Sequence, residues 1–222
     1  MQRQVSNGLR EINVALKNQG INMDKLTTFI IPTIGRKTLE RSISSLKFQA
    51  FDNWKAIVLF DGVEPTIKEE EHVRVITLSE KLGAEIAGAC GQAGQVRNIG
   101  MKSVDTKWIS FLDDDDYVSH AYTAFLAKID KESPTADIVI FRMYNSSFNT
   151  VLPPRGLTRI EENKLGISFS VKADFIRETN CYFRNSNTED FIYLSEAERL
   201  GAEIVLAPWI TYFVGKPYTW EY

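Results

Sequence analysis

The strongest constraint on the fold is a repeated alternation of apolar runs with amphipathic segments. Continuous apolar runs cover residues 27–31, 54–62, 73–79, 108–113 and 137–144, and helical spacing of apolar residues lies between most of them, notably in 37–50, 93–104 and 119–131. Strands that are apolar throughout are buried on both faces, and the intervening helices cover those faces. The alternation therefore predicts an α/β fold with a mostly parallel central sheet flanked by helices.

The length of the chain favours a single domain. Its 222 residues are enough for one sizeable core. Residues 1–25 are expected to contain a short N-terminal helix, and residues 26–144 carry most of the alternating pattern. From about residue 145 the texture changes to a long loop punctuated by Pro153 and Gly156, followed by a strand, a helix over 188–200 and a last strand. We interpret residues 145–222 as the second half of the same domain.

Charge and composition exclude several classes of protein. The net charge of −3 gives no basic face for nucleic acid. The only cysteines, Cys90 and Cys181, cannot form a disulfide framework or a four-cysteine zinc site. The polar N-terminus does not resemble a signal peptide, and no apolar run has the length of a membrane span. We expect a protein of a reducing, cytoplasmic compartment.

Polar residues follow three of the expected strands. The first strand leads into Pro32 and Thr33, the second ends at Asp61, and the fourth ends in four consecutive aspartates, Asp113 to Asp116. Ligands of open α/β sheets bind beyond the carboxyl ends of the strands. These groups are therefore expected to converge on one ligand-binding edge.

The four aspartates are the most informative cluster. Neighbouring carboxylates repel and raise one another's pKa, so a cation would stabilise them. Magnesium typically binds one or two carboxylates together with substrate phosphates. The alternative is an acidic cap of the helix expected over 119–131, since acids favour a helix N-terminus. Four acids exceed what a cap requires, which favours a metal site.

Three further candidates each have an ordinary structural alternative. Arg97 at a helix start, after the glycines at positions 88, 91 and 94, suits an anionic ligand or simply an acidic neighbour. Asp61 before Gly62 is also a common turn pair. Glu189 and Asp190 after Thr188 suit a capped helix start. Functionally, Asp190 would be a general base that removes a proton from an acceptor hydroxyl.

In order and spacing, these segments resemble the GT-A glycosyltransferases, most closely inverting family 2. The resemblance covers about residues 26–208 and rests on "TFIIPTIGR" with the following helix and "WKAIVLFDG", on "GQVRNIG" leading into "WISFLDDDD", and on "TEDFIYLSEAERLG". It implies a GT-A fold. It also implies transfer of one sugar from a nucleotide-diphosphate sugar, UDP-sugar favoured over GDP-sugar, to a glycan or other hydroxyl acceptor with inversion.

The resemblance also implies roles for individual residues. Asp190 would be the catalytic base. Asp115 would hold Mn²⁺ or Mg²⁺, with Asp113 near the metal and the ribose, although Asp114 or Asp116 could replace either. The remaining expected substrate-binding residues are Pro32, Thr33, Asp61, Arg97, Asp114 and Glu189. Residues 26–144 would bind the nucleotide-sugar, and residues 145–222 would form the acceptor side.

Some features depart from the family pattern and leave other functions open. The Gln-x-x-Arg-Trp element of processive synthases is absent, and no histidine follows His120 to complete a metal site. A retaining GT-A transferase would share the metal site without needing Asp190 as a base. A non-catalytic nucleotide- or sugar-binding module would bind without turnover. A nucleotidyltransferase fits less well, because "PTIGRKTLE" has a single glycine after the first strand.

Overall fold

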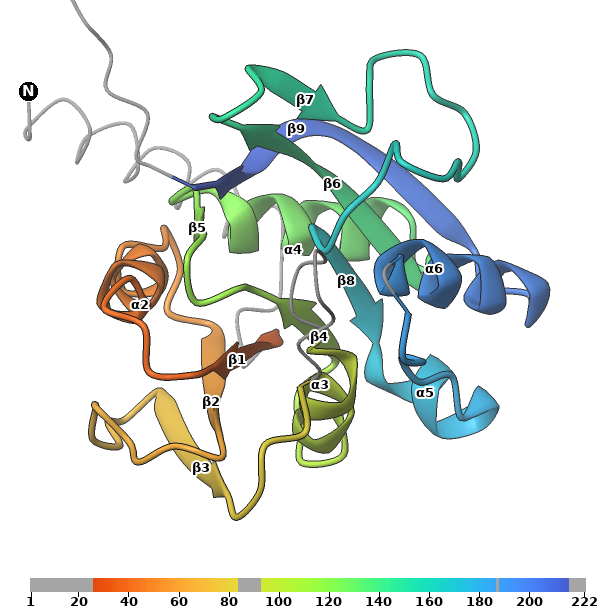
Figure 1. Cartoon of the computed structure of the whole chain (residues 1–222). Coiled ribbons are helices and arrows are strands. Elements are labelled where there is room, and N and C mark those ends of the chain that lie inside the picture. Colours follow the sequence, from red (N-terminus) through yellow and green to blue (C-terminus); the bar gives the residue numbers. More distant parts are fainter. Residues whose placement is uncertain (1–25, 84–92, 187, 216–222) are drawn as a thin grey trace, which may run out of the picture.

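The computed structural model describes residues 26–83, 93–186 and 188–215. The expected N-terminal helix lies outside these residues, as do Cys90 and the glycines at positions 88 and 91. Within them, the chain folds into α/β layers around a nine-stranded sheet with the order β3-β2-β1-β4-β8-β6-β9-β5, and β7 pairs with β6 (Figure 1). No helix in these residues is long and apolar enough to cross a membrane.

The first half of the sheet is parallel, as the alternating pattern predicts. It consists of β1 (Thr27–Thr33), β2 (Trp54–Asp61), β3 (Val73–Leu78) and β4 (Trp108–Phe111). The strand β1 lies between β2 and β4, with Thr27 opposite both Trp54 and Trp108. Every residue of β1 and β4 is buried, including their threonine and serine residues, so neither strand alternates apolar with exposed polar residues.

The second half joins in mixed orientation. The strands β5 (Tyr117–Val118), β6 (Ile138–Asn145), β7 (Thr150–Leu152), β8 (Phe169–Lys172) and β9 (Ile204–Val214) complete the sheet. The strand β8 is antiparallel to β4 and β6, whereas β9 is parallel to β6. The whole sheet is therefore mixed, and its parallel half carries the polar strand ends.

The prediction of a long loop after residue 145 is wrong for its first part, which forms a β-hairpin. Residues 145 and 150 pair, and β7 returns along β6 as a hairpin. Asn149 has a positive φ of 49°, and Asn145 accepts hydrogen bonds from the backbone N–H groups of Ser147 and Phe148. Asparagine side chains stabilise turns in this way. The segment lacked an apolar alternation, and the turn was formed by asparagines without glycine.

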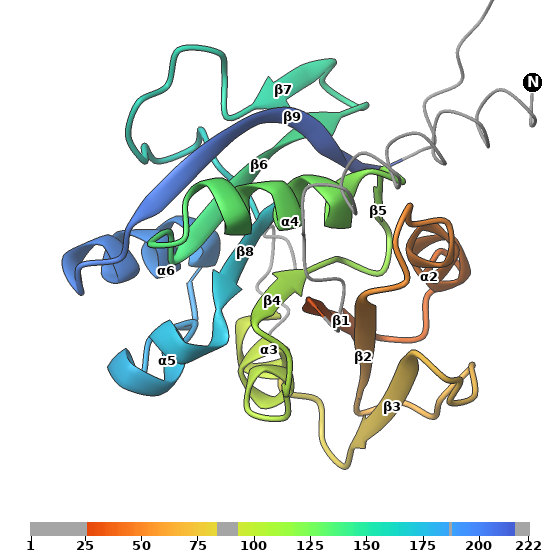
Figure 2. The same ribbon diagram turned by 180° about the vertical axis from the view of Figure 1, so that it is seen from behind.

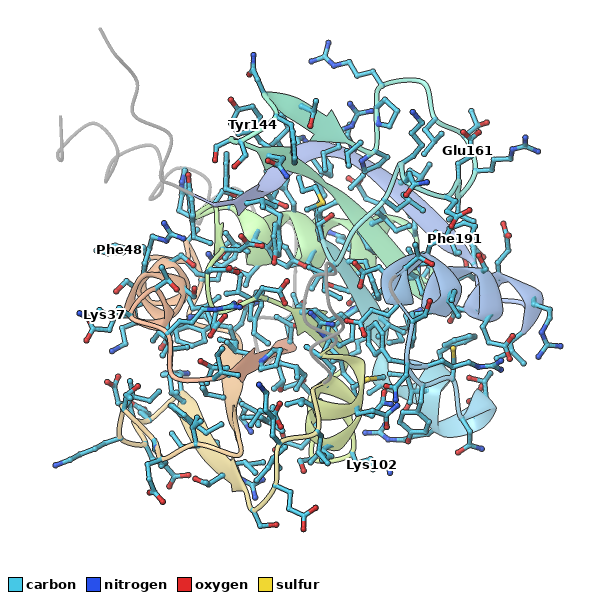
Figure 3. The ribbon with its side chains drawn as sticks, viewed as in Figure 1. Lys37, Phe48, Lys102, Tyr144, Glu161 and Phe191 are labelled. Carbon is cyan, nitrogen blue, oxygen red and sulfur yellow. The ribbon has the colours of Figure 1, made fainter. Side chains whose placement is uncertain are left out.

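Helices cover both faces of the sheet. They are α2 (Leu39–Lys47), α3 (Gly94–Met101), α4 (Tyr122–Glu132), α5 (Ala173–Thr179) and α6 (Glu189–Arg199). Figures 1 and 2 show α4 on one face of the second half and α6 on the opposite face. Side chains fill the space between the layers, while Lys37, Phe48 and Lys102 lie at the periphery (Figure 3).

Buried hydroxyl groups join the two halves across the sheet. Thr27 Oγ1 lies 2.8 Å from Ser110 Oγ, which lies 2.7 Å from Ser170 Oγ. The hydroxyl of Tyr122 lies 3.0 Å from the same Ser170 oxygen. Each of these four hydroxyl groups thus has a partner, which removes the cost of burying it unpaired. This chain of hydroxyls connects β1, β4, β8 and α4 in the interior.

Candidate functional site

The site lies where the parallel strands β1 and β4 end. Their carboxyl ends meet at the same edge because Ile30 lies opposite Phe111 in parallel register. Thr33, the last residue of β1, donates a hydrogen bond from Oγ1 to Asp114 Oδ2 at 2.6 Å. The preceding Pro32 is buried and lies opposite Leu59 of β2. Proline has no backbone N–H, and Pro32 lies beyond the last residue of β1 that pairs with β4. The convergence expected from the sequence is found for these two strand ends.

Two of the four aspartates are buried and hold the turn. Asp114 accepts hydrogen bonds from Thr33 and, at 2.7 Å, from Nη1 of Arg36. Asp116 Oδ1 accepts the backbone N–H of Gly215 at 3.0 Å. Burial, and then the charge of Asp113, raise the pKa of Asp116 to about 7. Both carboxyl groups are directed at protein partners.

The other two aspartates face solvent to a larger extent. The side chains of Asp113 and Asp115 are 32% and 49% exposed, compared with 3% for Asp114. Burial, followed by the negative charge of Asp113, raises the pKa of Asp115, although Arg36 at 3.2 Å opposes the shift. The alternation of exposed and buried carboxylates gives the cluster an accessible pair with one residue between them.

The helix-cap explanation of the cluster does not hold. The helix α4 begins at Tyr122 and has no acidic residue in its first turn. The backbone carbonyl groups of the cluster are instead held by α2. Ser42 Oγ donates to the carbonyl oxygen of Asp116 at 2.6 Å, and Arg41 donates to that of Asp115. The acidic turn is therefore fixed from outside by α2.

Arg97 joins the aspartates to the start of α6. Its Nη2 donates to Asp113 Oδ1 at 2.5 Å, and its Nη1 donates to Glu189 Oε1. Burial alone would lower the pKa of Arg97, but the charges of Asp113 and Glu189 raise it above its ordinary value. The anion expected near this helix start is thus a pair of protein carboxylates.

Asp190 follows Glu189 in the first turn of α6. Thr188 occupies the N-cap position, as expected, but its side chain makes no capping hydrogen bond. Burial raises the pKa of Asp190 to about 7, with Arg97 opposing and Asp113 and Glu189 adding to the shift. Its buried Oδ1 has no hydrogen-bond partner among the described residues. Such a carboxyl group can exchange a proton near neutral pH.

The carboxylate of Asp61 binds the backbone of the loop that follows β3. Its Oδ1 and Oδ2 accept the N–H groups of Leu82 and Gly83 at 2.7 and 2.8 Å. The side chain is buried at the end of β2 and makes no direct contact with the aspartate cluster among the contacts of the described residues. The structure therefore brings Thr33, Asp113 to Asp116, Arg97, Glu189 and Asp190 into one network. Asp61 stays outside this network, at the end of the neighbouring strand β2.

The sequence interpretation did not identify three residues of the network. Arg36 and Arg41 contact the cluster from the segment after β1 and from α2. The hydroxyl of Tyr212 on β9 accepts the backbone N–H of Asp113 at 3.1 Å. Arg36 had a local signal, because a cation soon after a strand end lies at the edge where the acids gather. Tyr212 had none, because its partner is 99 residues away.

The carboxylates of the site are candidate ligands of a divalent cation. Among the described residues, no group of three or more histidine, cysteine, aspartate or glutamate side chains is arranged to hold a metal ion. Asp113 and Asp115 nevertheless offer two accessible carboxylates at one strand end. Magnesium and manganese accept such oxygen ligands and take the remainder from water and phosphate. The residues fit an ion that binds together with a phosphorylated ligand.

Comparisons with known proteins bear on the family and the fold of the chain. The family model described as glycosyl transferase family 2 matches residues 28–190. A crystal structure of residues 1–349 of S. aureus TarS superposes with a TM-score of 0.65 at 18% identity, covering 86% of this chain and 60% of that one. The complex of the same TarS fragment with UDP-GlcNAc gives 0.67 at 16% identity, with coverages of 87% and 59%.

A complex of the fragment with UDP gives a TM-score of 0.62 at 16% identity, covering 86% of this chain and 60% of that one. The chain thus spans about 60% of the length of these solved fragments. Among curated proteins, no match was found. The likeness to TarS establishes the GT-A fold, and the family model covers most of the sequence, including the aspartate cluster and Asp190. The chain is therefore a member of glycosyl transferase family 2.

Proposed function

We propose that this glycosyltransferase moves one sugar from a nucleotide-diphosphate sugar to an acceptor hydroxyl with inversion, and that Asp190 is its base. One observation carries the proposal. A single guanidinium group, that of Arg97, contacts both Asp113 at the strand end and Glu189 beside Asp190. Arg97 therefore connects Asp113, a carboxylate suited to binding a cation, to Glu189, the neighbour of the candidate base Asp190.

In the proposed reaction, the acceptor oxygen replaces the diphosphate oxygen on the anomeric carbon. Asp190 accepts the proton of the acceptor hydroxyl as its oxygen forms a bond to the anomeric carbon. The bond between that carbon and the diphosphate oxygen breaks, and its electron pair leaves with the nucleoside diphosphate. Attack from the face opposite the leaving group inverts the carbon. A base with a pKa of about 7 suits proton transfer at neutral pH.

Asp113 and Asp115 would hold Mn²⁺ or Mg²⁺. When bound, the ion would neutralise the charge that develops on the departing diphosphate. Asp114 and Asp116 support this pair by fixing the turn, since their carboxyl groups are bound to Arg36, Thr33 and Gly215. We therefore place the ion on the two exposed aspartates, and Thr33, Pro32 and Asp61 around the nucleoside.

The donor class rests on the relatives. TarS was solved with UDP-GlcNAc and with UDP. A UDP-sugar is accordingly favoured for this chain, with a GDP-sugar as the second candidate. The acceptor is a hydroxyl group, of a glycan or another molecule, at the side where α6 begins.

The test is a donor screen that follows release of the nucleoside diphosphate. The purified chain is incubated with UDP- and GDP-sugars, with Mn²⁺ or after chelation, and with candidate hydroxyl acceptors. The proposal predicts metal-dependent release with one donor class, and NMR of the product should show an inverted anomeric centre. A retained anomeric configuration would contradict the role of Asp190 and indicate a retaining transferase. Binding without turnover would indicate a non-catalytic module.

A further inference from the structure

Both terminal nitrogens of the Arg97 guanidinium group bind protein carboxylates, whereas its buried Nε has no hydrogen-bond partner among the described residues. The residue is 3% exposed, and its two terminal nitrogens donate to Asp113 and Glu189. The guanidinium carbon also lies 5.5 Å from the ring centre of Phe183. A forked cation held between two carboxylates has a fixed orientation. This arrangement suits a residue that joins two elements, and it leaves little of the side chain for a ligand.

Glu189 also binds the backbone at the N-terminus of α3, the helix that carries Arg97. Its Oε2 accepts the backbone N–H of Gly94 at 2.9 Å, and its side chain is only 12% exposed. A carboxylate there complements the positive end of the α3 dipole. A Cβ atom at position 94 would lie 2.7 Å from Glu189 Oε2 and 2.8 Å from Phe183 Cβ. Glycine at this position therefore permits the close approach of Glu189.

The contacts of Arg97 and Glu189 form a clamp between three elements. Arg97 lies on α3, Asp113 follows β4, and Glu189 opens α6. The candidate base, Asp190, is the next residue of that helix. Any shift of Glu189 relative to Asp113 would move Asp190 relative to the exposed aspartates. Displacing a reacting group by about 1 Å can cost about 10²-fold in rate.

We propose that Arg97 and Glu189 are positioning residues, which fix the start of α6, and with it Asp190, against the carboxyl end of β4. This inference rests on the proposed function, because it assigns the base role to Asp190. It also revises the roles implied by the family resemblance, which placed both residues among the substrate-binding residues. The clamp sets the distance between the donor and acceptor sides of the reaction.

The experiment separates positioning from donor binding. Glu189→Gln removes the charge but keeps the size of the side chain. We expect kcat to fall by about 10²-fold while the Kd for UDP with Mn²⁺ changes by less than about twofold. Glu196→Gln is the matched control on the same helix, because Glu196 is ion-paired with Arg184 and Arg199 at the surface. The control should leave kcat and Kd unchanged.

Arg97→Lys provides the second variant. Lysine keeps the charge but lacks the planar fork that contacts two carboxylates at once. It should reproduce the loss of kcat, and both variants should show faster hydrogen–deuterium exchange in the first turns of α3 and α6. Weaker UDP binding with kcat unchanged would overturn the inference and make both residues donor ligands. Wild-type kcat and exchange in a folded Glu189→Gln protein would also overturn it.

Failure of the proposed function gives a different result. If the wild-type chain transfers no sugar from any donor, the proposed function is contradicted. The exchange measurement then still decides whether Arg97 and Glu189 hold α6, because it requires no activity. Unchanged exchange in both variants would show that the clamp does not fix the helix, and would overturn the inference independently.

Discussion

At the scale of single residues, Asp190 combines a buried carboxyl group with an unpartnered oxygen. Burial stabilises the protonated form and raises its pKa to about 7. A carboxyl group with an ordinary pKa would be a weaker base. The adjacent Arg97 keeps it from rising further. The position of Asp190 near Arg97 thus sets a basicity suited to activating a hydroxyl group.

Replacing Asp190 by asparagine should separate binding from chemistry. Asparagine cannot accept the proton, so kcat should fall by about 10²- to 10⁴-fold. The affinity for UDP with Mn²⁺ should stay near the wild-type value, because Asp113 and Asp115 are unchanged. Steady-state kinetics and calorimetric titration test this. Transfer at the wild-type rate would show that another group acts as the base.

The same variant should alter the dependence of stability on pH. The pKa of Asp190 is raised in the folded state, so its stabilising contribution is present below about pH 4 and is lost as the pH rises through about 7. Asp190→Asn should therefore melt above the wild type at pH 8, and the difference should shrink towards pH 4. Asp116 titrates in both proteins and cancels in the comparison. A difference that is independent of pH would contradict the raised pKa.

Arg36 supplies a third prediction at this scale. It is ion-paired with the exposed carboxylate of Asp115, and it also contacts the buried Asp114. Arg36→Ala should lower the melting temperature without metal, because the carboxylates then repel one another with less compensation. Added Mn²⁺ should raise the melting temperature more in the variant than in the wild type. An equal metal shift in both proteins would argue against an ion beside Asp115.

Residue types and local order pointed to several of the residues that the structure brings together in the candidate site. The aspartate cluster could be singled out because four consecutive acids exceed what a helix cap requires, and Asp190 because the order of the segments resembles that of the family. The partners could not. Arg97 lies 16 residues before Asp113 and 92 before Glu189 in the sequence. Such pairings depend on how elements pack, which local pattern does not encode.

At the scale of elements, α3 is built to lie close to the sheet. Gly100 faces β1 and β2, where an added Cβ atom would lie 2.7 Å from Ile30 Cγ2 and 3.0 Å from Leu59 Cδ1. Only a residue without a side chain allows this distance. Arg97 lies on the same helix, so the close packing of α3 against the sheet also fixes the position of Arg97 relative to the sheet.

Gly100→Ala should therefore destabilise the fold. Overpacking a core costs about 1–3 kcal/mol, and each kcal/mol lowers the melting temperature of a chain of this size by about 2–4 °C. Ser103→Ala, at an exposed position just beyond the helix, is the control and should leave the melting temperature nearly unchanged. A Gly100→Ala protein as stable as the wild type would show that the packing relaxes freely. Thermal unfolding followed by circular dichroism measures both.

Elements with strong patterns were predicted closely, and weak ones were not. The buried β2 was expected over 54–62 and spans Trp54–Asp61, and the helix expected over 188–200 spans Glu189–Arg199. The two-residue β5 and the three-residue β7 have no periodicity to detect. They form because β5 pairs with β9 and β7 pairs with β6, and these pairings depend on tertiary structure.

At the scale of the whole molecule, one sheet runs through both halves of the chain. The strands β4 and β8 pair across the boundary, and the hydroxyl chain from Thr27 to Ser170 is buried there. We predict that the chain unfolds as one cooperative unit. Calorimetry should give one transition with equal calorimetric and van't Hoff enthalpies. Two separated transitions would contradict the single-domain interpretation.

The most direct test of the central claim is a thermal-shift measurement with UDP, with and without Mn²⁺, on the wild type and Asp115→Asn. At a hundred times its Kd, a ligand that binds only the folded state adds about 2.7 kcal/mol. Asp174→Asn, which alters an exposed aspartate paired with Arg177, is the matched control. We expect a manganese-dependent shift in the wild type and the control, and its loss in Asp115→Asn. A shift of equal size in all three proteins would contradict the metal assignment, and no shift with UDP or GDP in the folded wild type would contradict a nucleotide-sugar site at this edge.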